Sequence, residues 1–223
     1  MFINSTGYYI PEARIPNSYF TEINGLSDEW IEQRTGIKTR SRATEEETME
    51  YMCSQAVKKA LPSLPYNIKD VDLIIFASYS PSDTVATVGH IIQREHNIEG
   101  AKVFYVSSAC SSAINAIEII RAFFYSHMAS KALMICAERN STYSNDEDPV
   151  SGHLWGDAAT AFFFSDMAFK DKEPQVLDII TEGMGQIGHG TKGVSLRPKD
   201  DGISMPYGKD VFIQACTYIT QNT

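Results

Sequence analysis

The sequence has few cysteines, and their spacing indicates neither a metal site nor a disulfide framework. Its four cysteines, Cys53, Cys110, Cys136 and Cys216, form no C-x-x-C pair and match no zinc-ligand pattern. Reduced thiols in a cytoplasmic protein are therefore the expectation. Long hydrophobic runs are also lacking, because no stretch approaches the ~18 apolar residues of a membrane span. The N-terminus lacks the basic start and the apolar segment of a secretory signal.

Positive charge is scarce as well. The chain has 19 Lys and Arg against 28 Asp and Glu, a net charge of −9. Because phosphate binding needs a basic surface, this balance argues against nucleic acid as a partner. Hydrophobic residues are abundant instead: 43% of the 223 residues are hydrophobic and 11% are aromatic. That content suffices for a packed core in one large domain or two small ones.

Strand-like and helix-like segments alternate along the chain, which predicts an α/β fold. Apolar runs predict strands at residues 2–9, 71–77, 103–106, 131–137, 158–164 and 175–182. Helical spacing and capping signals predict helices at residues 27–35, 85–95 and 207–221, and one directly after Thr44. Thr44 and Glu47 have the spacing of a capping box, and Ser27 and Gly36 bracket the first of these helices.

The stretch from Lys102 to Met128 contains the strongest candidate for chemistry. Its apolar run predicts a buried strand, and a helix with one apolar face begins after the small residues around Cys110. Free N–H groups and the dipole at a helix start favour an anion, so the Cys110 thiol is expected to ionise readily. Cys110 should then be alkylated before the other three cysteines, which lie in core-like contexts. The pattern alone leaves a structural role open, because free cysteine usually behaves as a small buried hydrophobe.

Four motifs occur in an order that resembles the β-ketoacyl-acyl-carrier-protein synthase III branch of the thiolase-like condensing enzymes. They are SDEWIEQRTGI at 27–37, SSACSS at 107–112, WGDAATAFFF at 155–164 and GKDVFIQA at 208–215. The resemblance extends over essentially all 223 residues. It implies an α/β, thiolase-like layered αβαβα fold, with the first half and the opening of the second present. Residues 1–168 would form the N-terminal half with the nucleophile, and residues 169–223 the incomplete start of the C-terminal half.

The resemblance implies an acyltransferase of fatty-acid or related acyl-chain biosynthesis. Cys110 would accept an acyl group from acyl-coenzyme A, and the acyl-enzyme would condense with a carbanion formed by decarboxylation of malonyl-acyl-carrier protein. By motif position, Trp30 would stack on the adenine of coenzyme A and Arg34 would meet its phosphates. The coenzyme A thioester is a substrate, and no metal or bound cofactor is implied. A cytoplasmic homodimer is expected.

Three basic residues could form a docking face for the acidic carrier protein: Lys38, Arg40 and Arg42. The family completes its site with a histidine and an asparagine from the second half. None of the five histidines matches that motif: His90, His96, His127, His153 and His189. We therefore expect this catalytic set to be incomplete, condensation by this chain alone to fail, and the natural protein to continue past Thr223.

Alternatives remain open within and outside this family. The SGHLWGD stretch at 151–157 is closer to specialised synthases of the aryl-polyene or dialkylresorcinol type, which join longer acyl chains. A non-catalytic partner subunit of a condensing enzyme would keep the same fold. A cysteine thioesterase would form the same acyl-enzyme and release it to water. The sequence does not determine the acyl length, the donor, or whether the product belongs to primary or specialised metabolism.

Overall fold

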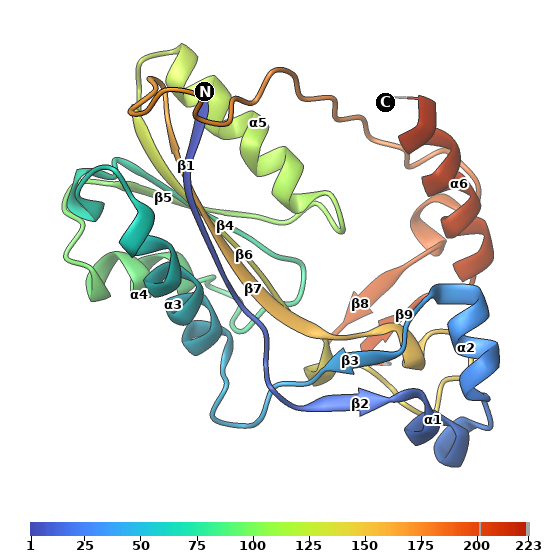
Figure 1. The fold of residues 1–223 in the computed structure, drawn as a ribbon. Coiled ribbons are helices and arrows are strands. Elements are labelled where there is room, and N and C mark those ends of the chain that lie inside the picture. Colours follow the sequence, from blue (N-terminus) through green and yellow to red (C-terminus); the bar gives the residue numbers. More distant parts are fainter. Residues whose placement is uncertain (201, 222–223) are drawn as a thin grey trace. The chain divides into compact units, whose positions relative to one another are not determined.

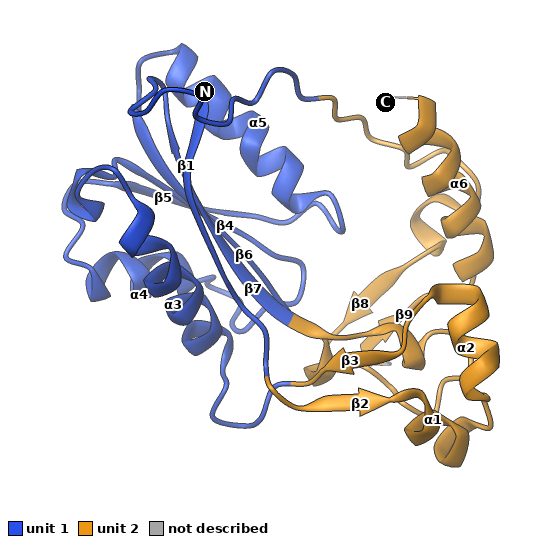
Figure 2. Ribbon diagram, in the orientation of Figure 1, with its two compact units in different colours: residues 1–11, 43–138, 158–179 blue, residues 12–42, 139–157, 180–223 orange. Residues whose placement is uncertain are grey.

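A computed structural model describes residues 1–200 and 202–221 of the chain. By contacts between Cα atoms, the chain divides into two units that are described separately (Figure 2). Unit 1 comprises Met1–Pro11, Ala43–Glu138 and Ala158–Ile179, and unit 2 comprises Glu12–Arg42, Arg139–Asp157 and Ile180–Thr223. Thr223, past which the chain was expected to continue, lies outside the described residues.

Unit 1 is built on a five-stranded sheet with the strand order β1-β7-β6-β4-β5 (Figure 1). β1 runs antiparallel to β7, and β4 runs parallel to both β5 and β6. The predicted α/β architecture is confirmed. The elements of this unit, two of which extend one residue beyond it, are β1 (Phe2–Tyr9), α3 (Met49–Ala60), η1 (Leu61–Ser63), η2 (Ile68–Asp70), β4 (Leu73–Ala77), α4 (Val88–Glu95), β5 (Lys102–Val106), α5 (Ser112–Tyr125), β6 (Lys131–Arg139) and β7 (Asp157–Ser165).

Helices α3 and α4 cover one face of this sheet, and α5 covers the other (Figure 1). The apolar side chains of α3 recur at helical spacing and are fully buried, as Met52 and Ala56 show. Gly7 of β1 lies so close to α3 that an added Cβ would overlap the Ala56 carbonyl oxygen and lie 2.6 Å from the Ala60 nitrogen. Only glycine therefore allows this contact between strand and helix.

The start of α3 differs from the prediction. Thr48, not Thr44, caps the helix, because its side chain accepts the Tyr51 backbone N–H at 3.2 Å. The Thr44 backbone N–H does donate to the Glu47 carboxylate at 2.8 Å, so half of the predicted capping box forms in the turn before the helix. The Tyr9 hydroxyl also donates to Glu47, at 2.5 Å. These bonds hold the Glu47 carboxylate outside the first helical turn, and Thr48 takes the capping position.

Two predicted strands also differ. Residues 175–182, all described by the structure, form no strand, and only an isolated bridge joins Gln175 to Phe2. Beyond that bridge the chain leaves the sheet, and Leu177 is 85% exposed. The strand predicted at 103–106 exists as part of β5, but it was predicted to be buried, and this is wrong. Because β5 is an edge strand, Phe104 is 43% exposed and Tyr105 is 37% exposed.

Unit 2 contains two small antiparallel strand pairs, β2 with β3 and β8 with β9. Its elements are β2 (Arg14–Pro16), α1 (Asn17–Asn24), α2 (Asp28–Thr35), β3 (Thr39–Ser41), η3 (Asn140–Thr142), η4 (Gly152–Leu154), η5 (Gly190–Lys192), β8 (Ser195–Arg197), β9 (Gly202–Ser204) and α6 (Gly208–Gln221). The prediction for α2 is confirmed: Ser27 accepts the Trp30 backbone N–H, and Gly36 ends the helix with a φ of 72°. Among residues 1–200 and 202–221, no helix combines the length and apolarity that crossing a membrane requires.

Candidate active site

Cys110 lies in a tight turn between β5 and α5, and its side chain is exposed. The helix begins at Ser112, after Ala109 has taken a left-handed conformation with a φ of 51°. The Ser112 hydroxyl closes the turn, since it accepts the Ser108 N–H at 2.8 Å and donates to the Ala109 carbonyl at 2.7 Å. The predicted order of strand, cysteine and helix is therefore confirmed, with small side chains around the thiol.

The first two backbone N–H groups that follow Cys110 are already used within this turn. The Ser111 N–H donates to the Ser108 carbonyl, and the Ser112 N–H donates to the Ala109 carbonyl, both at 3.2 Å. The sequence predicted free N–H groups here that would stabilise a thiolate. For these two donors the prediction is wrong, because the left-handed turn before the helix brings its own carbonyl oxygens to them.

The predicted lowering of the Cys110 pKa is also wrong. Although the residue is exposed, desolvation by the surrounding protein raises the pKa of its thiol. The negative charge of Glu138 raises this pKa further, and the backbone N–H of Cys110 itself lowers it. The thiol is therefore predominantly protonated at neutral pH, and it has to lose its proton when it acts as a nucleophile.

Glu138, near the carboxyl end of β6, is a residue of this site that the sequence analysis missed. Its carboxylate accepts the backbone N–H groups of Tyr79 and Ser80, each at 2.9 Å. It also accepts the hydroxyl groups of Ser80 and of Ser78, the latter at 3.3 Å. Burial raises the pKa of Glu138, and these donors act in the opposite direction. The signal in the sequence was an acidic residue directly after an apolar strand.

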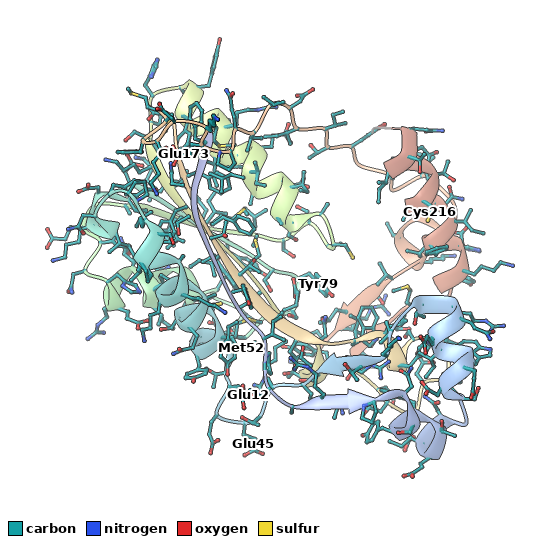
Figure 3. All side chains as sticks on the ribbon, in the orientation of Figure 1. Glu12, Glu45, Met52, Tyr79, Glu173 and Cys216 are labelled. Carbon is teal, nitrogen blue, oxygen red and sulfur yellow. The ribbon has the colours of Figure 1, made fainter. Side chains whose placement is uncertain are left out.

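The other cysteines have distinct environments. Cys53 is fully buried, and desolvation raises the pKa of its thiol far above the ordinary range. Burial raises the pKa of Cys136 to about 12. Cys53 therefore has the core position that was predicted, whereas Cys136 is half-buried and packs against the core. Cys216 has no core position: it is exposed on α6, a helix with no buried residue among those described (Figure 3). Cys110 thus has an exposed competitor for alkylating reagents.

Trp30 and Arg34 lie one turn apart on α2 and contact each other. The guanidinium carbon of Arg34 is 4.3 Å from the centroid of the Trp30 ring, a cation–π distance. The buried imidazole of His153 meets Trp30 edge-on, with ring centroids 5.6 Å apart at 76°. The predicted shared face of Trp30 and Arg34 is confirmed, and their roles toward adenine and phosphate stay predictions. Both residues belong to unit 2, whereas Cys110 belongs to unit 1.

The predicted docking face is wrong for two of its three residues. Arg40 is only 5% exposed, and its guanidinium donates to the Asn17 side chain at 2.8 Å. Arg42 donates two hydrogen bonds to the Asp146 carboxylate, at 2.9 and 3.0 Å. Both arginines therefore bind side chains within unit 2, and their guanidinium groups connect its segments. Lys38 has an exposed side chain.

Comparison with known proteins supports the resemblance. A family model described as 3-oxoacyl-[acyl-carrier-protein (ACP)] synthase III matches residues 104–183, which include Cys110. A β-ketoacyl-[acyl-carrier-protein] synthase III of Aquifex aeolicus (strain VF5) is 38% identical over 159 residues, which cover 71% of this chain and 51% of that protein. A protein of the same name from Clostridium botulinum (strain 657 / Type Ba4) is 33% identical over 217 residues, which cover 93% of this chain and 65% of that protein.

The fold agrees with a solved structure of the same kind. The crystal structure of 3-oxoacyl-[acyl-carrier-protein] synthase III from Aquifex aeolicus VF5 matches with a TM-score of 0.80 and 30% identity, covering 96% of this chain and 66% of that one. The chain spans about half the length of the first curated relatives that it matches. By its fold the chain is a thiolase-like protein, and in its sequence matches and its strand–cysteine–helix turn it is similar to the β-ketoacyl-[acyl-carrier-protein] synthases III.

Proposed function

We propose that the protein is an acyltransferase that performs a decarboxylative Claisen condensation through an acyl-cysteine on Cys110. The observation that carries the proposal is the exposed thiol of Cys110 in the turn between β5 and α5, inside the region that matches the synthase III family model. The acyl donor is a coenzyme A thioester, and the acceptor is malonyl-acyl-carrier protein. The product enters fatty-acid or related acyl-chain biosynthesis.

The first step is transfer of the acyl group to Cys110. Its sulfur attacks the thioester carbonyl, a new C–S bond forms, and the C–S bond to coenzyme A breaks. Coenzyme A leaves as a thiolate and takes up the proton that Cys110 loses. Because burial and Glu138 raise the pKa of Cys110, removal of this proton is part of the barrier, and transfer accelerates as the pH rises.

The second step joins the acyl group to the malonyl unit. The bond between the malonyl carbon and its carboxylate breaks and carbon dioxide leaves. The carbanion then forms a C–C bond to the acyl carbonyl, and the C–S bond to Cys110 breaks, which returns the thiolate. The chemistry requires no bound cofactor. We further propose that residues 1–168 form the half that carries the nucleophile, and that the protein acts as a cytoplasmic homodimer.

Trp30 and Arg34 are proposed to bind the nucleotide end of coenzyme A. The indole is half-buried and offers a flat aromatic surface to adenine, and Arg34 is exposed next to it. A guanidinium suits phosphate because it can donate two parallel hydrogen bonds. The contact between Arg34 and Trp30 at 4.3 Å supports a site in which one residue stacks and its neighbour pairs with the charge.

The experiment is intact-mass measurement after incubation with acyl-coenzyme A donors of increasing chain length. We expect the mass of one acyl group on the native chain and on a Cys216→Ala variant, and none on Cys110→Ala. Acylation with long donors only would favour the specialised synthases that join longer chains. Spontaneous loss of the acyl group to water would favour a thioesterase. No acylation with any donor would contradict the proposal and favour the non-catalytic partner subunit. Acylation that persists in Cys110→Ala would also contradict it, because another residue would then be the nucleophile.

A further inference from the structure

The loop of residues 78–80 lies where the carboxyl ends of three parallel strands meet. β4 lies between β5 and β6, and Ala77 at its end is paired with Val106 of β5 and with Cys136 of β6. The next residue, Ser78, continues this pairing, since its N–H donates to the Val106 carbonyl at 3.1 Å. Cys110 follows Val106 by one tight turn. The loop is therefore attached directly to the strand end from which the nucleophile's turn begins.

Glu138 binds this loop from the other side. It stands two residues beyond Cys136, and its two carboxylate oxygens divide the loop's donors between them. Oε1 accepts the Tyr79 N–H at 2.9 Å, and Oε2 accepts the Ser80 N–H at 2.9 Å together with the Ser80 hydroxyl. Tyr79 is labelled in Figure 3, and Ser80 is fully buried. A single side chain from β6 thus fixes two consecutive peptide groups of the loop after β4.

Glu138 also faces a group of thiols. Its charge raises the pKa of Cys110 in the turn after β5, of Cys136 on its own strand and of Cys53 on α3. Cys53 is affected in addition by Glu50 of α3. Cys53 is fully buried, and Cys136 is half-buried with a pKa raised to about 12, so Cys110 is the thiol whose reactivity can report the charge of Glu138.

We propose that Glu138 is a positioning residue, which holds residues 78–80 against the end of β5 and so fixes the turn that carries Cys110. Its carboxylate holds the loop by accepting hydrogen bonds from the Tyr79 and Ser80 N–H groups. The hydrogen bond from the Ser78 N–H to the Val106 carbonyl then connects the loop to the end of β5. The negative charge that this arrangement places near Cys110 adds to desolvation in raising the pKa of the thiol. The importance of this for acyl transfer rests on the proposed function, whereas the effects on the loop and on the thiol do not.

The test uses two variants of the full chain in a Cys216→Ala background, so that Cys110 is the thiol that reacts. Glu138→Gln removes the charge and keeps one acceptor oxygen. We expect the pH profile of Cys110 alkylation by iodoacetamide to move to lower pH, with the rate at neutral pH rising by roughly threefold. The matched control is Glu99→Gln, which removes an exposed acid from the same unit and should leave the profile unchanged. An unmoved profile in Glu138→Gln would overturn the proposal.

Glu138→Asp keeps the charge but shortens the reach by one methylene group, so it tests the loop separately. We expect hydrogen exchange of the Tyr79 and Ser80 amides to accelerate by roughly tenfold or more, because each loses its acceptor. Unchanged exchange of both amides would also overturn the proposal, and this readout remains if Glu138→Gln does not fold. Neither measurement uses an acyl donor. A failure of acyl transfer to Cys110 would therefore be distinguished from a failure of this inference.

Discussion

Replacing Arg34 by alanine should weaken the binding of coenzyme A by about 1–2 kcal/mol, or roughly 5- to 30-fold in Kd. A hydrogen bond between a guanidinium and a phosphate contributes about 1.5–3 kcal/mol. The contact that Arg34 makes with Trp30 at 4.3 Å reduces this gain, because it has to be given up on binding. An exposed cation–π contact is worth about 0.5–1 kcal/mol, and Arg34 gives it up when it turns to a phosphate. The difference between the two contributions is the expected loss.

The assay is isothermal titration of the native chain and of Arg34→Ala with coenzyme A and with pantetheine, which lacks the nucleotide. Low ionic strength is needed because salt screens exposed charges. Binding of pantetheine should be unchanged, since its contacts do not reach the nucleotide site. Lys38→Ala is the matched control, because Lys38 is an exposed cation that already pairs with Glu32 at 3.2 Å. Equal losses for both ligands would refute the reasoning and show that Arg34 only stabilises α2. Tighter binding of coenzyme A would show that Arg34 covers the ring face that adenine needs.

Two further predictions concern stability. Gly7→Ala should destabilise the chain by about 1–3 kcal/mol and lower Tm by roughly 2–12 °C, because the new Cβ meets the backbone of α3. Gly183→Ala, at which a Cβ meets nothing within 4 Å, is the control in the same thermal melt, and equal Tm values would contradict the close packing of β1 on α3. Asp146→Asn should cost about 1–2 kcal/mol in urea unfolding, because Arg42 loses a bidentate partner whose side chain is only 19% exposed. A midpoint equal to that of the native chain would mean that this ion pair contributes nothing.

The parts of the fold that were predictable depend on local chemistry. Ser27 caps α2 and Gly36 ends it, because a serine oxygen and a left-handed glycine act within a few residues. The turn at Cys110 was predictable for the same reason, since small residues follow an apolar strand and precede an apolar helix face. The cap of α3 was not, because the Tyr9 hydroxyl reaches Glu47 from 38 positions away and competes with the local pattern.

The parts of the site that were not predictable depend on contacts between distant segments. Glu138 meets the Tyr79 N–H across 59 positions, so no local pattern could indicate its role. Arg40 alternates with Lys38 and Arg42 as a solvated strand would, yet its partner Asn17 lies 23 positions earlier and draws it inside. The prediction that the Cys110 thiol ionises readily failed for a similar reason. Its helix start was visible in the sequence, but the competing charge and the carbonyl oxygens of the turn were not.

The position of β5 at the edge of its sheet has a practical consequence for handling the protein. An edge strand presents a row of main-chain donors and acceptors on which another chain can add a strand. Charged side chains usually protect such edges, but β5 carries only Lys102, at its first position, followed by the apolar run from Val103 to Val106. The partly exposed aromatic rings of Phe104 and Tyr105 add apolar surface that also favours association with other chains. Protein concentration is therefore an experimental variable, and thiol kinetics and titrations with this chain belong at dilutions where light scattering shows no aggregates.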